Sequence, residues 1–361
     1  MDLHVLVLPG DGIGTEVTRE AVRVLRHVAA KFNHTLHLAE GLLGGVAIHQ
    51  TGTPFPAETA RLAADADATL LGAVGLPEFD QCPPEKRPEK GLLDIRKALG
   101  VFANLRPVRT FKALLDSSPL KNELVKETNM IIVRELTGGI YYGTPRGISG
   151  SGAETRAVNT MTYTRAEIER VAHMAFRLAR ARRRKVTSVD KSNVLENSQL
   201  WRKVVTEIAA EYTDVALDHL LVDNCAMQLI LNPRRFDVVL TENMFGDILS
   251  DEGAVLAGSI GMLPSASLGG RKASGAFAGL YEPVHGSAPD IAGRNKANPL
   301  GAIGSVAAML EYSFGLQDEA ARVNAAIEEV LDSGCVTADL KRTGAPATTE
   351  QVGEAVCAAI G

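Results

Sequence analysis

Short apolar runs alternate with helical patterns along this chain, and no other feature restricts its fold as strongly. Strand-like runs lie at residues 3–8, 68–71, 129–133, 186–189 and 236–240. Segments with helical periodicity lie at residues 15–31, 165–181, 194–211 and 323–331. Strands separated by helices build a sheet whose strands are mostly parallel, with helices on its faces. The sequence therefore predicts an α/β fold with a mostly parallel sheet.

Size and composition narrow the class of protein. With 361 residues, 45% of them hydrophobic, the chain can bury a sizeable core, and we expect two domains. A formal net charge of -5 and the lack of a basic tail argue against a nucleic-acid partner. The 4 cysteines form no CxxC pair, which argues against a zinc site or a disulfide framework. Residues 1–8 are too short for a signal peptide and no apolar run is long enough to span a membrane, so we expect a cytoplasmic protein without a membrane partner.

Two acids follow the apolar run at residues 236–240. Asp247 and Asp251 are four residues apart, so on a helix they project from one face. Like charges at this spacing destabilise a helix by about 0.2–0.5 kcal/mol unless a cation lies between them. Carboxylate oxygens are the ligands that Mg²⁺ and Mn²⁺ prefer. A solvated acidic helix face is the commoner arrangement, and this segment by itself leaves both interpretations open.

Charged residues also follow several of the other apolar runs. Arg106, Arg134, Lys191 and Asp223 stand in such positions, where any one of them could be merely structural. Arg106 and Arg134, with Arg96 close in sequence, could clamp carboxylates through paired hydrogen bonds. Lys191 could act as a base if it is buried near cations, and Asp223 could add a third carboxylate to the acid pair. Together these residues describe a site for a small polycarboxylate chelated to a divalent metal.

Two further segments carry weaker signals. Residues 10–14 read Gly-Asp-Gly-Ile-Gly, but Thr15 stands where the GxGxxG dinucleotide fingerprint continues, so a tight strand-to-helix turn is the better interpretation. A bound dinucleotide would need another binding segment, and the best candidate is residues 279–290, continuing to 298–299. From its composition alone, this stretch is only an irregular surface loop. Residues 137–163 are rich in Gly, Ser and Thr, and we expect an arm that pairs with a second subunit.

Five motifs occur in the order found in the β-decarboxylating dehydrogenases, the isocitrate/isopropylmalate dehydrogenase family. They are residues 10–14, 134–141, 190–191, 243–251 and 285–298. The chain resembles this family over nearly its whole length. The resemblance implies a two-domain isocitrate/isopropylmalate dehydrogenase-like fold, without a Rossmann GxGxxG turn, and a homodimer with shared active sites. The first domain would comprise residues 1–99 plus 255–361, and the second residues 100–254, with the intersubunit arm at about 138–163.

The resemblance also implies a substrate and metal site. By position, the residues that would bind the substrate carboxylates are Arg96, Arg106 and Arg134. Asp247 and Asp251 would hold one Mg²⁺ or Mn²⁺ per active site. The partner subunit would supply Asp223, which would contact both metal and substrate.

The implied reaction is NAD-dependent oxidative decarboxylation of a 2-hydroxy acid. Lys191 of the partner subunit matches the base that takes the C2 hydroxyl proton while hydride leaves for the nicotinamide. After CO₂ is lost, the metal would stabilise the enolate oxygen, and Tyr141 matches the acid that returns a proton to carbon. Tyr142 is its neighbour, and the register of the motif assigns the role to Tyr141.

Residues 89–93 match the wall that faces the substituent on C3. Leu92 and Leu93, with Glu89 beside them and the partner subunit's Val194, suit an isopropyl group, since each buried CH₂ contributes about 0.8 kcal/mol. We therefore expect 3-isopropylmalate, a leucine-biosynthesis intermediate, as the substrate. The two leucines could instead belong to a helix core, and D-malate, tartrate or another 3-alkylmalate remain alternatives. A non-catalytic regulatory relative would usually lack the base or a metal acid, whereas both are present here.

The resemblance assigns NAD binding to one loop. Its expected contacts are His285, Gly286, Ser287, Ala288, Asp290 and Asn298. Asp290 stands where NADP-using relatives carry a lysine, and an acid there would accept hydrogen bonds from ribose and repel a 2′-phosphate. Thr15, Ser192 and residues 147–154 depart from the usual pattern. Glu242 also departs from it and adds a charge near the metal or cofactor, but the sequence assigns no role to this charge.

Overall fold

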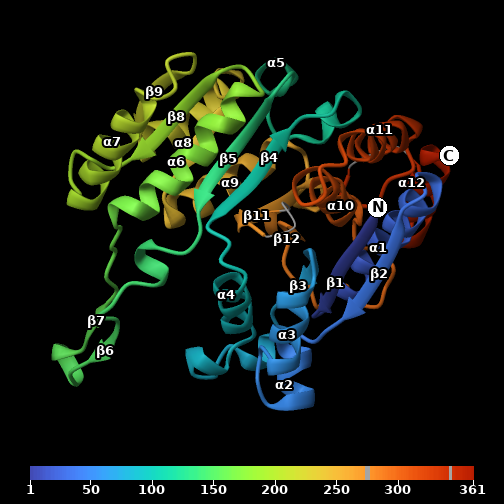
Figure 1. Cartoon of the computed structure of the whole chain (residues 1–361), viewed down its shortest axis with the longest axis horizontal. Helices are drawn as coiled ribbons and strands as arrows, with labels where there is room; N and C mark the ends of the chain where they lie inside the picture. Colours follow the sequence, from blue (N-terminus) through green and yellow to red (C-terminus); the bar gives the residue numbers. More distant parts are fainter. Residues whose placement is uncertain (273–276, 341–343) are drawn as a thin grey trace. The chain divides into compact units, whose positions relative to one another are not determined.

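Strands with helices packed on them build both units into which the chain divides. The computed structural model describes residues 1–272, 277–340 and 344–361. Unit 1 comprises Met1–Val101, Phe111–Pro119 and Ala257–Gly361, and unit 2 comprises Phe102–Thr110 and Leu120–Leu256 (Figure 1). Unit 1 therefore contains both ends of the chain.

Unit 1 contains five strands in the order β2-β1-β3-β12-β11. The strands are β1 (Asp2–Gly10), β2 (Thr35–Glu40), β3 (Ala68–Ala73), β11 (Pro264–Arg271) and β12 (Phe277–Pro283). The helices are α1 (Gly14–Lys31), α2 (Gly45–Thr51), α3 (Ala57–Asp65), α4 (Pro88–Ala98), α10 (Leu300–Tyr312), α11 (Gln317–Ser333) and α12 (Thr349–Ile360). Short 3₁₀ turns complete the unit: η1 (Pro77–Phe79), η2 (Pro84–Lys86), η3 (Lys112–Ser117) and η7 (Ile260–Met262).

The core of unit 1 lies between its strands and helices. Every residue of β3 is buried, as expected for a strand covered on both faces. α1 turns one apolar stripe inward, with Val17, Val24 and Val28 each at 0% exposure. Burying a side chain of this kind stabilises the fold by about 1.5–3 kcal/mol. At the C-terminal end, Thr348 caps α12 by accepting a hydrogen bond from the Gln351 N–H at 3.2 Å.

Unit 2 contains five strands in the order β4-β5-β10-β8-β9 and a separate hairpin. The strands are β4 (Ala103–Arg109), β5 (Asn129–Glu135), β8 (Lys185–Asp190), β9 (Ala216–Leu221), β10 (Val238–Thr241) and the hairpin strands β6 (Gly147–Ser149) and β7 (Arg156–Val158). The helices are α5 (Asn122–Val125), α6 (Arg165–Arg180), α7 (Glu196–Ala209), α8 (Val222–Leu231) and α9 (Asn243–Leu256), and the 3₁₀ turns are η4 (Gly139–Tyr141), η5 (Gly152–Glu154) and η6 (Pro233–Arg235). α6 packs on α7 and α8 packs on α9.

The hairpin β6–β7 stands away from the sheet of unit 2, at the end of a long connection before α6 (Figure 1). All of its residues are exposed. A two-stranded hairpin is at best marginally stable by itself, so an exposed one is suited to packing against something else. Among the described helices, none combines the length and the apolar character that crossing a membrane requires.

The predicted mostly parallel sheet is confirmed, and its described strands include antiparallel pairs that the sequence did not reveal. β1 pairs in parallel with β2 and β3, and β10 with β5 and β8. The antiparallel pairs are β11–β12 and β4–β5. Alternating strands and helices predict parallel neighbours, so the alternation by itself did not predict these antiparallel pairs.

Two local expectations were wrong. Gly279–Pro283 is not an irregular loop but the end of the buried strand β12. Its sequence has no period-two alternation because both faces are covered. Arg106 does not follow a strand but lies in the middle of β4, opposite Ile132 of β5. The sequence predicted that the strand ends before Arg106 because Pro107 follows, and proline usually marks the edge or end of a strand.

Candidate active site

Helix α9 brings its acid pair against two arginines from neighbouring strands of unit 2. The Arg134 guanidinium, from the end of β5, donates to Asp247 through Nη1. Arg106, from β4, donates to Asp251 Oδ1 at 3.1 Å and lies 3.6 Å from Asp247 Oδ1. Ser250 Oγ accepts a second bond from Arg106 at 2.6 Å. The predicted grouping of these arginines with the acid pair is therefore present within one chain.

The charges of this cluster are complementary to those of a metal bound to a dicarboxylate. In the single chain the arginines neutralise the acids. A bound divalent cation would instead pair with the acids, and a substrate anion would pair with the arginines. Asp251 is 61% exposed and Asp247 33% exposed at their side chains, so both carboxylates can be reached by an ion. Within the described part of the chain, no group of three or more His, Cys, Asp or Glu side chains is placed to hold a metal. One chain thus offers hard oxygen donors that fit Mg²⁺ or Mn²⁺, but an incomplete set.

Tyr141 completes the cluster from the 3₁₀ turn η4. Its hydroxyl donates to Asp247 Oδ2 at 2.9 Å, and the Arg134 guanidinium lies 5.7 Å from the centre of its ring. Burial, together with the bond to Asp247, raises the pKa of Tyr141 to about 12. A phenol of ordinary pKa is already protonated at neutral pH, so Tyr141 has its proton available, and the raised pKa makes it a weaker acid.

Sequence reasoning did not identify Asn243 as a residue of the site. Its Oδ1 accepts from Arg134 Nε at 2.9 Å and from Nη2 at 2.8 Å, which fixes the plane of the guanidinium. Its Nδ2 donates to the carbonyls of Leu136 and Gly138. Asn243 thereby ties α9 to the segment that leads into η4. The sequence signal was available, since Asn243 begins one of the recognised motifs, but the motif by itself did not show what Asn243 contacts.

Gly246 provides the space in which the Arg134 side chain passes α9. A Cβ atom at this position would lie 2.3 Å from Thr241 Oγ1 and 2.7 Å from both Cβ and Cγ of Arg134. We expect Gly246→Ala to lower the free energy of unfolding by about 1–3 kcal/mol, because overpacking shifts buried atoms. Displacement of Arg134 by about 1 Å should reduce kcat/KM by roughly 10²-fold. Thermal unfolding and steady-state kinetics of the variant check both effects.

Gly253→Ala provides the matched control on the same helix. Its added Cβ would lie 3.0 Å from Val108 Cγ2 and 3.6 Å from Ile132 Cδ1, which are the far ends of side chains. Alanine also improves helix propensity by roughly 1 kcal/mol, so this variant should retain activity and stability. Equal activity of the two variants would contradict the role given to Gly246.

Lys191 and Asp223 form a second pair in unit 2. In the described part of the single chain they pair with each other, at 2.5 Å between Lys191 Nζ and Asp223 Oδ1, rather than with the α9 acids. The Lys191 ammonium holds the pKa of Asp223 below its usual range. Lys191 follows β8 directly, and Asp223 lies in the first turn of α8. The buried Asp190 carboxylate, bound by Arg202 at 2.8 and 3.0 Å, fixes the turn that carries Lys191.

In unit 1 the predicted cofactor loop begins where β12 ends. His285 is buried, and burial lowers its pKa. Its Nδ1 bonds to the Gly286 carbonyl at 2.9 Å, and Nε2 is buried without a partner among the described residues. A buried neutral imidazole nitrogen without a partner is a vacant hydrogen-bonding position, which fits a loop that is completed by a ligand.

The Gly-Asp-Gly-Ile-Gly turn packs against this loop. The Ile13 N–H donates to the Ser287 carbonyl at 2.8 Å. At Gly12, where φ is +55°, a Cβ would lie 2.1 Å from the Ser287 carbonyl oxygen, so only glycine allows this approach. Asp11 accepts hydrogen bonds from the N–H groups of Gly45, Val46 and Gly75, each at 2.8 Å. The turn therefore organises neighbouring loops, as expected for a structural strand-to-helix turn.

The other predicted cofactor contacts differ in their surroundings. Asp290 and Gly286 are exposed, while Ser287 and Ala288 are half-buried. Asn298 is buried and already engaged, because Oδ1 accepts from the Leu300 N–H at 3.0 Å and Nδ2 donates to Asp339 at 3.0 Å. Its visible role is to hold the start of α10, and contact with a cofactor remains a prediction.

Helix α4 carries the remaining candidate substrate-binding residues on one face. Glu89, Leu92, Leu93 and Arg96 follow the i, i+3, i+4, i+7 spacing of a helix face. Arg96 is buried and donates to Glu282 Oε1 at 2.8 Å, with its Nε lacking a partner among the described residues. Leu92 and Leu93 are both half-buried and Glu89 is exposed, and Leu92 packs against the core of unit 1. Leu92 is thus partly a core residue, which was the alternative that the sequence left open.

Comparison with known proteins decides the family. The sequence profile described as isocitrate/isopropylmalate dehydrogenase matches residues 4–356. The chain belongs to the isocitrate/isopropylmalate dehydrogenase family. It is 55% identical over 362 residues to the 3-isopropylmalate dehydrogenase of Bacillus subtilis, covering 100% of this chain and 98% of the relative. It is 58% identical over 341 residues to that of Geobacillus kaustophilus, covering 94% and 91%.

The solved structures agree with the family assignment. The crystal structure of isocitrate dehydrogenase from Methylococcus capsulatus superposes with a TM-score of 0.88 at 34% identity, covering 99% of each chain. The resemblance read from the five motifs and the fold that it implied are thereby confirmed.

Proposed function

We propose that this chain is a NAD- and divalent-metal-dependent enzyme that converts 3-isopropylmalate into 4-methyl-2-oxopentanoate and CO₂, a step of leucine biosynthesis. The observation that carries the proposal is the meeting of Arg106, Arg134 and Tyr141 at the Asp247/Asp251 pair. This cluster suits a metal-chelated 2-hydroxy dicarboxylate. The substrate follows from the relatives that are more than 50% identical and are 3-isopropylmalate dehydrogenases.

The side chains of the cluster divide the chemistry among them. Arg106 and Arg134 would orient the substrate carboxylates. Lys191 of the partner subunit would take the proton of the C2 hydroxyl as the C2 hydrogen leaves as hydride for the nicotinamide of NAD. The bond from C3 to its carboxylate then breaks and releases CO₂, and Tyr141 donates its phenolic proton to C3. Because Tyr141 is protonated at neutral pH, it can supply this proton without prior activation.

Asp247 and Asp251 are the residues that would hold the divalent metal, with Asp223 of the partner subunit as the third carboxylate. When bound, the metal would act as a Lewis acid on the C2 oxygen and stabilise the charge that develops there. In the single chain, Arg106 and Arg134 provide the positive charge beside the acids. When metal and substrate bind, the acids would therefore exchange the arginines for the metal, and the arginines would exchange the acids for the substrate carboxylates, within a cluster that is already assembled.

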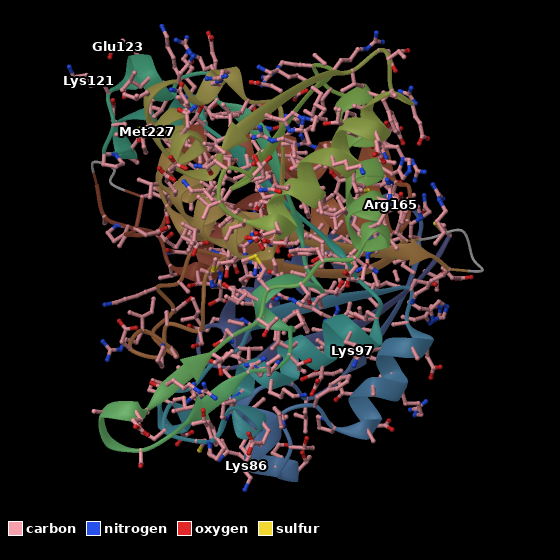
Figure 2. All side chains as sticks on the ribbon, turned by 90° about the vertical axis from the view of Figure 1, so that its left-hand side faces the viewer. Lys86, Lys97, Lys121, Glu123, Arg165 and Met227 are labelled. Atoms are coloured by element: carbon pink, nitrogen blue, oxygen red, sulfur yellow. The ribbon has the colours of Figure 1, made fainter. Side chains whose placement is uncertain are left out.

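An exposed apolar surface supports the homodimer. Five large apolar side chains of unit 2 are between 45% and 62% exposed: Val194, Met227, Leu231, Ile248 and Val255. Four of them lie on α8 and α9, which pack against each other, and Figure 2 labels Met227 among them. Asp223 lies one turn before Met227 on α8, and Val194 follows Lys191 by three residues. A second copy covering this surface would contact the Lys191–Asp223 pair, and the exposed hairpin β6–β7 would add a further contact.

The cofactor preference gives a separate prediction. Asp290 is exposed on the His285 loop, where it can accept a bond from a ribose hydroxyl and repels a phosphate. We expect kcat/KM for NAD to exceed that for NADP by roughly 10²-fold, since like-charge juxtaposition costs several kcal/mol. Asp290→Asn should reduce this ratio mainly by improving the use of NADP. A wild-type preference for NADP would refute the assignment of NAD.

The proposed activity is tested by NADH formation from 3-isopropylmalate, D-malate, isocitrate and tartrate. Each substrate is assayed with Mg²⁺, with Mn²⁺, and after treatment with a chelator. 3-Isopropylmalate should give the highest kcat/KM because Leu93 and the partner subunit's Val194 present apolar surface to its isopropyl group. Activity that survives chelation would refute the metal assignment, and equal use of D-malate would refute the substrate assignment. As a biosynthetic enzyme of this type, the protein would function in the cytoplasm.

A further inference from the structure

We propose that Glu242 is a positioning residue that holds the metal-binding acids of α9 and the Tyr141 turn in one fixed arrangement. The inference rests on the proposed metal site at Asp247 and Asp251. It gives a role to the acid whose charge the sequence could not explain.

The Glu242 side chain caps the start of α9. Its Oε1 accepts from the Phe245 N–H at 2.6 Å, and its Oε2 accepts from the Met244 N–H at 3.1 Å. The cap fixes the first turn of α9, and Asp247 lies in the next turn of the same helix. Ser, Thr, Asp and Asn are the usual residues at such a position, because their short side chains reach the first N–H groups. The longer Glu242 side chain also reaches a second partner.

That second partner is Tyr163. Its hydroxyl donates to Glu242 Oε2 at 3.3 Å and accepts from the Asn243 N–H at 2.9 Å. Glu242 is 3% exposed and Tyr163 is 8% exposed, so these bonds form away from water. Loss of either partner would leave buried polar groups unsatisfied.

The Tyr163 ring supports the turn that carries Tyr141. A Cβ on Gly138 would lie 2.7 Å from Tyr163 Cε1, and a Cβ on Gly139 would lie 2.5 Å from its hydroxyl oxygen. The two glycines therefore allow η4 to lie directly on the ring. One continuous set of contacts runs from the α9 cap through Tyr163 to the turn of the proton donor.

A second buried acid holds the other side of the same turn. Glu135 Oε2 accepts from the Gly138 N–H at 2.7 Å, and Glu135 Oε1 accepts from the Thr137 hydroxyl at 2.9 Å. Burial raises the pKa values of both Glu135 and Glu242, and the N–H groups around each carboxylate counteract this effect. Glu135 binds the turn and accepts from Arg170 of α6 at 3.2 Å, whereas Glu242 joins the turn to the helix that bears the acid pair.

Residues that orient metal ligands usually matter almost as much as the ligands. Replacing such a partner typically costs about 10- to 100-fold in metal affinity or activity. Glu242→Ala removes the cap and the link to Tyr163. Glu242→Gln keeps one carbonyl acceptor and leaves the other N–H group facing an amide. Tyr163→Phe keeps the cap, and it removes both the link to Glu242 and the acceptor of the Asn243 N–H group.

The test measures Mn²⁺ binding to the full-length protein with saturating 3-isopropylmalate, from the electron paramagnetic resonance signal of free Mn²⁺. We expect the Mn²⁺ dissociation constant to rise by about 10- to 100-fold for Glu242→Ala. Glu242→Gln and Tyr163→Phe should give intermediate values. Thr348→Ala is the matched control, because it removes the cap of α12 in unit 1. Its thermal stability should fall by an amount similar to that for Glu242→Ala, with Mn²⁺ affinity unchanged.

The outcomes separate this inference from the proposed function. If the wild type binds Mn²⁺ and Glu242→Ala binds it equally well, the positioning role is overturned while the metal site stands. If Thr348→Ala weakens Mn²⁺ binding as much as Glu242→Ala does, general destabilisation explains the loss and the inference also fails. If the wild type binds no Mn²⁺, both the proposed metal site and this inference are overturned. If Glu242→Ala does not fold, the Mn²⁺ affinities of Glu242→Gln and Tyr163→Phe provide the test. Wild-type Mn²⁺ affinity in both variants would overturn the positioning role of Glu242.

Discussion

Replacing Asp247 with asparagine should lower kcat/KM by about 10²–10³-fold, the usual cost of removing one electrostatic contact from an active site. Asp247 accepts hydrogen bonds from both Arg134 and Tyr141, and it is one of two acids that would hold the metal. The amide has no charge for the metal and only one acceptor oxygen. Steady-state kinetics over a range of Mn²⁺ concentrations should show that the loss is not recovered by saturating metal.

Stability must be measured alongside activity for this variant. The Arg134 side chain is only 4% exposed and would lose the carboxylate that neutralises it. Breaking a buried ion pair costs up to about 3–5 kcal/mol, and Asp247 is one-third exposed, so a smaller decrease is expected. Kinetics are therefore recorded well below the unfolding temperature of the variant.

Glu252→Gln is the matched control on the same helix. Glu252 is half-buried, and it directly follows Asp251 without belonging to the arginine cluster. Its neutral isostere should leave kcat/KM close to that of the wild type. A loss of less than tenfold in Asp247→Asn, or an equal loss in both variants, would contradict the role proposed for Asp247.

A heterodimer that combines two inactive subunits should recover activity. One subunit carries Asp223→Asn and the other carries Asp247→Asn, and each homodimer alone is expected to be inactive. If Asp223 acts in the partner's active site, one of the two sites of the heterodimer contains both wild-type acids. Co-expression with two different affinity tags isolates the mixed dimer, whose kcat per dimer should be about half that of the wild type.

The same experiment excludes the alternative in which each site is built from one chain. In that case both sites of the mixed dimer would contain a substituted acid, and no activity would return. In the structure of the single chain, Asp223 pairs with Lys191 rather than with Asp247. A dimer that carries both substitutions in one subunit and none in the other is the reciprocal control, since each of its sites then has one substituted acid under the shared-site arrangement. It should be inactive if the sites are shared and half-active if they are not.

Local sequence predicted the parts of the site that depend on periodicity and order. The i, i+4 spacing placed Asp247 and Asp251 on one helix face, as α9 has them. Apolar runs marked β5 and β8, whose ends carry Arg134 and, directly after the strand, Lys191. Where periodicity was absent, the prediction failed: β12 was interpreted as a loop because a strand covered on both faces shows no alternation.

Contacts between residues far apart in sequence were beyond this reasoning. Asn243 binds Arg134 across 109 positions, and Tyr141 reaches Asp247 across 106. Gly246 is needed because Arg134 passes beside it, and Gly12 is needed because Ser287 lies against it. A single sequence shows that these glycines are present but does not show what fills the space beside them.

The sequence by itself determined the alternation of strands and helices, the helical spacing of the acid pair and membership of the family. These properties are local or depend on the order of motifs, so they can be read without knowing which segments meet. Only the tertiary structure decided that Arg106 and Arg134 neutralise the α9 acids, that His285 has a buried nitrogen without a partner among the described residues, and that Glu242 reaches Tyr163. The physical reason is that hydrogen bonds and ion pairs depend on positions in space, which are set by how the strands and helices pack.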